Sequence, residues 1–175
     1  MPDCYLREIT HTDIKVIHTW RNDKAIVDGL GSTYRYVNLE TEEQWFTKYQ
    51  NNRATQVRLA VVNKSDDVLI GMVSLVQIDS LARTAELALQ IGNRNFWGCG
   101  VGKWATQSAI THAFNNLNLN RVYLYVLVEN KSAQAVYQST GFQEEGILRQ
   151  AIYKSGEYRD LLVMSILHNE FVVGN

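Results

Sequence analysis

Two spacings of apolar residues alternate along this chain. Short stretches rich in β-branched and aromatic residues predict strands over residues 5–9, 57–63, 69–77, 85–91, 121–128, 147–153 and 158–167. Apolar residues spaced by three or four predict helices: one after Thr12-Asp13 with Ile14 and Ile17 on one side, one beginning at a capping box Thr41–Gln44, one over residues 101–117 and one over 132–139.

The order of these elements predicts a mixed α/β (α+β) fold. A central sheet of about seven strands, mostly antiparallel, is expected to be flanked by about four helices on both of its faces. The sequence contains no internal repeat and no long linker, so residues 1–175 are interpreted as a single domain. Gly29–Asn38 is the longest segment without either spacing and is expected to form an irregular loop rich in aromatic residues.

Composition and charge exclude several classes of protein. The chain has 17 Lys and Arg residues against 18 Asp and Glu residues, which argues against binding nucleic acid through a global positive field. Cys4 and Cys99 lack CxxC spacing and the four histidines form no metal motif, so no metal site is expected. The absence of a signal-like start or a long apolar run predicts a cytoplasmic protein with no membrane partner.

Four of the eleven glycines fall between Gly92 and Gly102. The segment Trp97–Lys103 lies between a predicted strand and a predicted helix. Glycines let the backbone turn tightly and let an anion approach bare N–H groups. The following helix adds its free N-terminal donors, so the segment predicts a pyrophosphate cradle, although a turn made only for packing is the alternative.

Two common phosphate motifs do not fit this segment. A Walker A loop needs Ser or Thr after its Gly-Lys pair, and here Gly102-Lys103 is followed by Trp104. A Rossmann fingerprint needs a third glycine three residues after the second, and Lys103 stands at that place.

The chain resembles the GCN5-related N-acetyltransferase (GNAT) superfamily in two separated motifs. The first is Trp97-Gly98-x-Gly100-Val101-Gly102 with the helix after it, and the second is N-x-x-A-x-x-x-Y-x-x-x-G-F over Asn130–Phe142. The tail, with Glu145-Gly146, Gly156-x-Tyr158-x-Asp160 and Met164, is similar to the branch with ribosomal-protein and spermidine acetyltransferases. Two positions depart from the usual pattern: Trp97 replaces Gln or Arg, and Cys99 replaces a cation that Lys103 or Arg94 could supply.

The resemblance implies acetyl-CoA as co-substrate and a set of contacts to it. The loop is expected to hold the phosphates, the strand end to pair with the pantetheine amides where it splays from its neighbour, and the start of the second motif to contact the pantetheine arm. The residues concerned are Trp97, Gly98, Cys99, Gly100, Val101, Gly102 and Lys103 in the loop, Leu89, Gln90 and Ile91 in the strand, and Asn130 and Ser132 in the motif. A structural cap for the following helix is the competing use of Asn130.

Two residues are candidates for proton transfer. The resemblance assigns reprotonation of the leaving thiolate to Tyr137, with a packed helical tyrosine as the alternative. Glu86 is the only charge in the strand AELALQI, on the same face as Ala88 and Gln90. It could act as general base if burial raises its pKa, orient the acceptor ammonium, or pair with Arg83 or Arg7.

The acceptor amine is expected to bind the N-terminal half of the chain. Trp20, Arg21, Tyr34 and Tyr36 are the candidate contacts, with core packing as the alternative for Trp20. A small-molecule amine, either a polyamine or an amino sugar, is the first hypothesis, and an acidic pocket lining would favour a polyamine. A protein N-terminal amine and a non-catalytic acyl-CoA-binding domain are the alternatives. A homodimer is implied only by analogy with the family.

Overall fold

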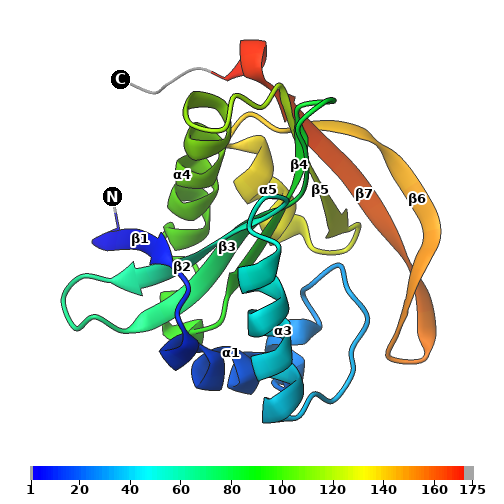
Figure 1. Ribbon diagram of the computed structural model, residues 1–175. Helices are drawn as coiled ribbons and strands as arrows, with labels where there is room; N and C mark the ends of the chain where they lie inside the picture. Colours follow the sequence, from blue (N-terminus) through cyan, green and yellow to red (C-terminus); the bar gives the residue numbers. More distant parts are fainter. Residues whose placement is uncertain (1, 172–175) are drawn as a thin grey trace.

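The computed structural model describes residues 2–171 and contains seven strands and five helices (Figure 1). In chain order these are β1 (Cys4–Glu8), α1 (Ile14–Arg21), α2 (Lys24–Val27), α3 (Leu39–Asn51), β2 (Val57–Asn63), β3 (Leu69–Asp79), β4 (Thr84–Ile91), α4 (Val101–Asn115), β5 (Arg121–Leu127), α5 (Lys131–Gln138), β6 (Gln143–Lys154) and β7 (Glu157–Leu167). Short 3-10 turns occur at His11–Asp13, Arg94–Phe96 and His168–Glu170.

All seven strands form one sheet in the order β1-β2-β3-β4-β5-β7-β6. Every neighbouring pair is antiparallel except β4 and β5, which are parallel. The predicted mixed, mostly antiparallel sheet is therefore confirmed. Helix α4 lies between the two strands of this parallel pair in the chain.

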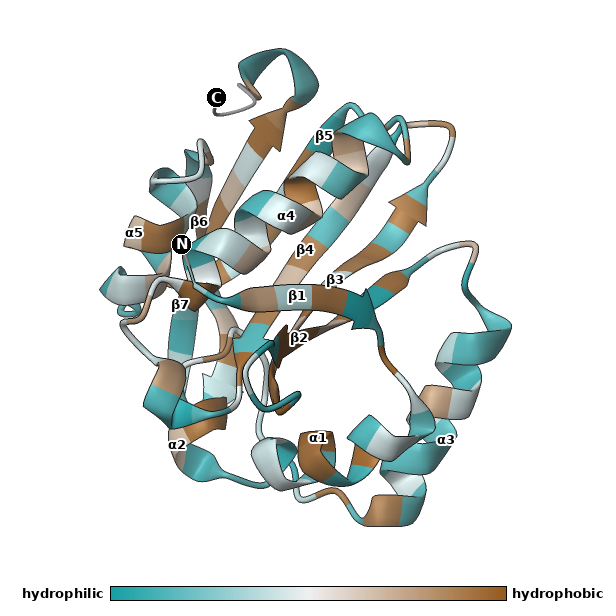
Figure 2. Cartoon of the chain, turned by 90° about the vertical axis from the view of Figure 1, so that its left-hand side faces the viewer, coloured by the Kyte–Doolittle hydropathy of each residue, from teal (hydrophilic) through white to brown (hydrophobic). Residues whose placement is uncertain are grey.

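Side chains that alternate along the strands separate two cores on opposite faces of the sheet. On β2, Val61 packs with the apolar residues of α4 and α5, whereas Ala60 and Val62 pack with α1 and α3. All three of these side chains are fully buried. Figure 2 shows the hydrophobic positions concentrated on the strands and in bands on the helices. Helices therefore cover both faces, as the element order predicted.

The structure corrects three local predictions. Helix α3 begins at Leu39, because the side chain of Asn38 accepts a hydrogen bond from the Thr41 N–H at 2.9 Å, so Asn38 and not Thr41 is its cap. The short helix α2 was not predicted. Strand β6 begins at Gln143, earlier than the predicted start at residue 147. The prediction missed these first residues because they form an exposed sheet edge without an apolar pattern.

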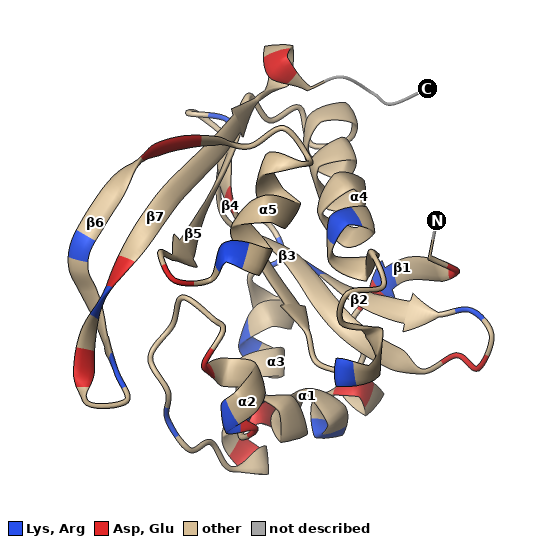
Figure 3. Cartoon of the chain, turned by 180° about the vertical axis from the view of Figure 1, so that it is seen from behind, with Lys and Arg blue, Asp and Glu red and all other residues tan. Residues whose placement is uncertain are grey.

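Charges of both signs are interspersed over the surface, as Figure 3 shows along α1, α2 and the β6–β7 hairpin. This agrees with the near-balanced composition. Within residues 2–171, no helix is long and apolar enough to cross a membrane.

Candidate active site

The glycine loop enters α4 through two left-handed residues. Gly98 has φ of 74° and Gly100, the N-cap of α4, has φ of 78°. A side chain at either position would meet no atom within 4 Å, so the loop presents open backbone. The first N–H groups of α4 have no partner inside the helix and point toward this space. Backbone donors and the positive helix end are the groups that the predicted anion cradle needs, and phosphate binding by this loop stays a prediction.

Cations near the cradle differ in their availability. Lys103 is exposed, and no ion pair involves it among the described residues. Arg94 lies 3.4 Å from the Asp23 carboxylate, so part of its charge is already balanced. Cys99 is exposed, with its sulfur 3.6 Å from the Trp97 carbonyl oxygen and 3.7 Å from that of Asn95. Lys103 is therefore the better replacement for the cation missing at Cys99.

Strands β4 and β5 are paired only at their beginnings. Their register joins Thr84–Glu86 with Arg121–Tyr123 and stops there, while β4 continues to Ile91 along β3. The ends of β4 and β5 therefore diverge, and backbone groups of Leu89–Ile91 on the β5 side are left for a ligand. The glycine loop lies at this opening, because the Cα of Gly102 faces Leu89, whose Cδ2 would contact an added Cβ at 3.6 Å.

Trp97 joins the loop to the strand end. Its indole N–H donates a hydrogen bond of 2.8 Å to the carbonyl of Ile91, while about half of the side chain stays exposed. The residue that departs from the usual pattern thus links the glycine loop to the end of β4.

Tyr137 lies on α5 with 7% of its surface exposed and its ring 5.8 Å from that of Phe142. Burial raises the pKa of its phenol to about 12, so the hydroxyl is protonated at neutral pH. No side chain or carbonyl among the described residues accepts its hydrogen bond. A buried, protonated and unengaged phenol suits a proton donor and is a poor base.

Asn130 caps α5 and also holds a distant loop. Its Oδ1 accepts hydrogen bonds from the Ala133 N–H at 3.1 Å and the Ser132 hydroxyl at 2.9 Å. Its Nδ2 donates to the Gly29 carbonyl at 2.8 Å. The structure therefore shows the capping contact of Asn130, and the contacts of Asn130 and Ser132 with the cofactor stay predictions.

Glu86 is half-buried on β4 and accepts a hydrogen bond of 2.8 Å from the Gln77 side chain. Burial raises the pKa of its carboxyl above the ordinary value. The suggested ion pairs are wrong, because Arg7 pairs with Asp13 at 2.7 Å and Arg83 donates to Asn118. Glu86 therefore keeps its charge free of any lysine or arginine within the described chain.

Two tyrosines of β5 lie on the same face as Glu86. Tyr123 is the register partner of Glu86, and its ring lies 5.8 Å from that of Tyr125 in an edge-on arrangement. Burial, and then the charge of Glu86, raises the pKa of Tyr123. The apolar pattern of residues 121–128 predicted a buried strand and gave no functional signal for Tyr123 or Tyr125. Only the pairing of β4 with β5 brings these two residues beside Glu86.

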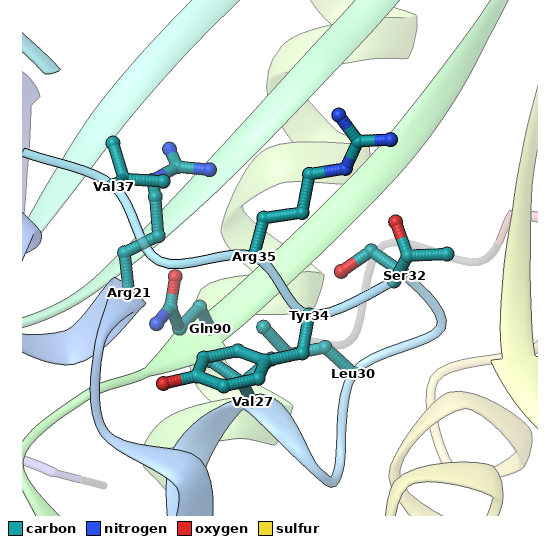
Figure 4. Close-up of a pocket in the computed structure, with 9 residues that line it drawn as sticks. Arg21, Val27, Leu30, Ser32, Tyr34, Arg35, Val37 and Gln90 are labelled. Carbon is teal, nitrogen blue, oxygen red and sulfur yellow. The ribbon is translucent and has the colours of Figure 1, made fainter. Parts of the chain in front are cut away.

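A pocket of about 240 Å³ lies on this side of the molecule, under the α2–α3 loop (residues 28–38) (Figure 4). Its lining comes from α1, α2, the loop and β4: Arg21, Val27, Leu30, Ser32, Thr33, Tyr34, Arg35, Val37 and Gln90. It thus contains Arg21 and Tyr34, two of the predicted acceptor contacts. We call it the α2–α3 pocket.

The other two predicted acceptor contacts lie elsewhere. Trp20 is 6% exposed and packs against Gly92, where an added Cβ would stand 1.9 Å from the indole ring. Its assignment to the acceptor is therefore corrected to core packing. Tyr36 is 86% exposed and packs edge-on against Tyr34, outside the pocket lining.

The pocket lining contains no carboxylate, so the acidic lining that would favour a polyamine is absent from it. Arg21 is balanced by Glu42, whose carboxylate lies 2.7 Å away. The buried side-chain nitrogen of Gln90 has no hydrogen-bond partner in the described chain. Gln90 was predicted as a cofactor contact through its backbone, and its side chain adds a free polar group on the pocket side of β4.

No cluster of three or more His, Cys, Asp or Glu residues suited to a metal ion occurs among residues 2–171. The groups assembled here are a backbone anion cradle, an opened strand pair, a protonated phenol and a half-buried carboxylate. Together they can hold a phosphate-bearing thioester and exchange protons on either side of it.

Comparison with known proteins identifies this arrangement. Residues 4–143 match the model of the acetyltransferase (GNAT) domain. This chain belongs to the GNAT family. The resemblance drawn from the two motifs is thereby confirmed, and with it an acetyltransferase that uses acetyl-CoA as donor.

Several relatives and solved structures are similar along most of the chain. The spermidine N(1)-acetyltransferase of Vibrio cholerae is 30% identical over 167 residues, covering 95% of this chain and 94% of the relative. A putative ribosomal N-acetyltransferase, YdaF of Bacillus subtilis, is 39% identical over 106 residues, or 61% and 57% of the two chains. The crystal structure of the Vibrio cholerae spermidine N-acetyltransferase with CoA and spermine superposes with a TM-score of 0.89 at 29% identity, covering 96% and 97% of the chains.

Proposed function

We propose that this GNAT protein transfers the acetyl group of acetyl-CoA directly to a primary amine of a polyamine. The observation that carries the proposal is the opening between β4 and β5, with the glycine cradle at one side and Glu86, Tyr123 and Tyr125 at the other. The thioester would lie in the opening with its phosphates on the loop. The amine would approach from the tyrosine side.

The reaction needs two proton movements. The neutral amine attacks the thioester carbonyl, a C–N bond forms, and the C–S bond breaks to release a thiolate. Tyr137, protonated because its pKa is about 12, supplies a proton to the sulfur and can regain one from solvent. Glu86 accepts the proton lost by the amine, directly or through water. Its raised pKa brings it closer to the working pH of a base.

The acceptor assignment is supported by a set of groups that attract cations. Glu86 is a carboxylate without a basic partner among residues 2–171, and the faces of Tyr123 and Tyr125 can contact ammonium groups. The guanidinium of Arg121 already lies 5.6 Å from the Tyr123 ring centroid, which is the geometry of such a contact. The likeness to spermidine acetyltransferases over nearly the whole chain also favours a polyamine.

A protein N-terminal amine is the second candidate. The lining of the α2–α3 pocket contains no carboxylate to balance the several ammonium groups of a polyamine, whereas a peptide N-terminus brings a single one. The likeness to a putative ribosomal N-acetyltransferase supports the same candidate.

A panel of amines separates these candidates. Purified protein is mixed with acetyl-CoA and spermidine, spermine, an amino sugar, an aminoglycoside or peptides with free N-termini, and release of the CoA thiol is followed. We expect the highest kcat/KM with spermidine or spermine. A peptide preference would transfer the proposal to the second candidate. Tight CoA binding without turnover of any amine would leave a non-catalytic acyl-CoA-binding protein.

A further inference from the structure

The side chain of Lys154, at the end of β6, is buried against the far side of the α2–α3 loop. The residue is 5% exposed. Its Nζ donates to the carbonyls of Val27 at 2.6 Å and Leu30 at 2.5 Å, with the Asp28 carbonyl at 3.5 Å. The three N–H donors of an ammonium are thus aimed at three carbonyls in four residues, and the side chain forms no ion pair in the described chain.

These carbonyls are groups that the short helix α2 leaves open. Val27 is its last residue, and carbonyls at a helix end have no partner within the helix. The Leu30 N–H also donates to the Val27 carbonyl, at 2.9 Å, so Lys154 binds a turn that is already folded. A second contact joins the same elements, because the Lys24 ammonium donates to the Ser155 hydroxyl at 3.3 Å.

The turn that Lys154 binds leads directly into the pocket wall. Val27 and Leu30 line the α2–α3 pocket themselves, and Ser32–Arg35 follow within the same loop. Asn130 fixes the neighbouring Gly29 carbonyl from the other side. The wall of the pocket therefore depends on a residue of the C-terminal hairpin that is more than one hundred positions away in sequence.

The buried position of the Lys154 ammonium requires that its N–H donors have hydrogen-bond partners. Burial lowers the pKa of Lys154, and the charges of Asp28 and Glu129 oppose that change. A buried ammonium is tolerated when its donors are all engaged, and this makes the contact geometrically specific.

We propose that Lys154 is a positioning residue for the acceptor: its ammonium holds the turn Val27–Leu30 so that the α2–α3 loop forms one wall of the acceptor site. This inference rests on the proposed function, since it assumes that the amine binds on this side. Lys154 contacts neither substrate nor the reacting atoms, so its effect is expected on acceptor binding and not on the acetyl-CoA site.

The test compares Lys154→Met with a matched control, Lys64→Met, in the exposed β2–β3 turn. Losing the charge-assisted hydrogen bonds should raise the acceptor KM about tenfold. The KM for acetyl-CoA should change less than about twofold, as for any site left intact. Amide hydrogen exchange over residues 28–36 should become faster, whereas Lys64→Met should match the unmodified protein in every measurement.

A second variant covers a folding failure. Lys154→Gln keeps two donors without the charge, and it should show the same changes at a smaller size. An unchanged acceptor KM with unchanged exchange would overturn the proposal, and so would an equal rise in the KM of both substrates. If the unmodified protein turns over no amine, the proposed function fails, and hydrogen exchange alone then decides whether Lys154 holds the loop.

Discussion

The acetyl-CoA side and the acceptor side of the proposed reaction centre are built in different ways. The acetyl-CoA side consists of β4, the glycine loop, α4 and α5, which follow one another closely in sequence and present mainly backbone groups. The acceptor side includes an irregular loop held by side chains from elsewhere, with Lys154 and Asn130 at its start and Asn22 and His18 bonding Val37 near its end. A cofactor site made of backbone resists substitution, whereas a loop held by single side chains can be remodelled.

This contrast implies that cofactor and acceptor binding can change separately. Donors of the first turn of α4 exist whatever side chains that turn carries. The wall of the α2–α3 pocket, in contrast, follows from a few contacts such as Lys154 with Leu30. Substitutions on the acetyl-CoA side should alter kcat or CoA affinity, and substitutions on the acceptor side should alter the acceptor KM.

The largest expected effect concerns Tyr137. Tyr137→Phe keeps the packed ring and removes the proton donor, so kcat should fall about hundredfold, as for loss of a general acid. The Kd of CoA, measured by calorimetry, should change little. Tyr153→Phe, an exposed tyrosine on β6, is the control. A rate that stays within about twofold of the unmodified protein would leave Tyr137 with the packing role alone.

The next effect concerns the cradle. Gly100→Val places a β-branched side chain at a φ of 78°, which costs about 1–3 kcal/mol and displaces the first turn of α4. We expect the Kd of CoA to rise about fivefold to 150-fold, which is the ratio that corresponds to this free energy. Gly146→Val on β6, where an added Cβ meets nothing within 4 Å, is the control. Equal Kd values for the two variants would contradict a backbone cradle.

Glu86 tests the proton transfer from the amine. Its folded-state pKa is raised by burial, and a base must be ionised, so kcat/KM should fall as pH falls through this raised pKa. Glu86→Gln should lower kcat about tenfold and remove this acidic limb. The amine itself also titrates, so the pH profile is measured with two acceptors of different basicity. A limb that moves with the amine pKa belongs to the acceptor and would exclude Glu86 as its source.

The sequence places the groups of the proposed acetyl-CoA side more directly than those of the proposed acceptor side, for a physical reason. Gly98, Gly100 and Tyr137 belong to local patterns in which spacing alone places each group on a turn or helix. The contacts of Trp20 with Gly92 and of Lys154 with Leu30 join residues far apart in sequence, and no local spacing encodes them. Trp20 was therefore assigned to the acceptor when it belongs to the core, and no local pattern marked Lys154.

The same limit applies to residues brought together by strand pairing. Glu86 was noticed because one charge interrupts an apolar strand, yet Tyr123 and Tyr125 fit their own strand pattern fully. Only the register of the parallel pair places Tyr123 opposite Glu86. The sequence alone therefore could not group Tyr123 and Tyr125 with Glu86, because that grouping depends on the topology of the sheet.

The smallest expected effect is at Trp97, which joins the glycine loop to the end of β4. Trp97→Phe keeps an aromatic ring but removes the N–H that binds the Ile91 carbonyl at 2.8 Å. One hydrogen bond at a half-exposed site contributes about 0.5–1.5 kcal/mol, so the Kd of CoA should rise about threefold to tenfold. Trp104→Phe on α4 is the matched control, because no hydrogen bond of its indole occurs in the described chain. If both variants weaken CoA equally, the contribution of Trp97 comes from its ring. If only Trp97→Phe weakens CoA binding, the hydrogen bond from Trp97 to Ile91 holds the glycine loop in place beside the end of β4. Trp97, which departs from the family pattern, is then part of the cofactor site.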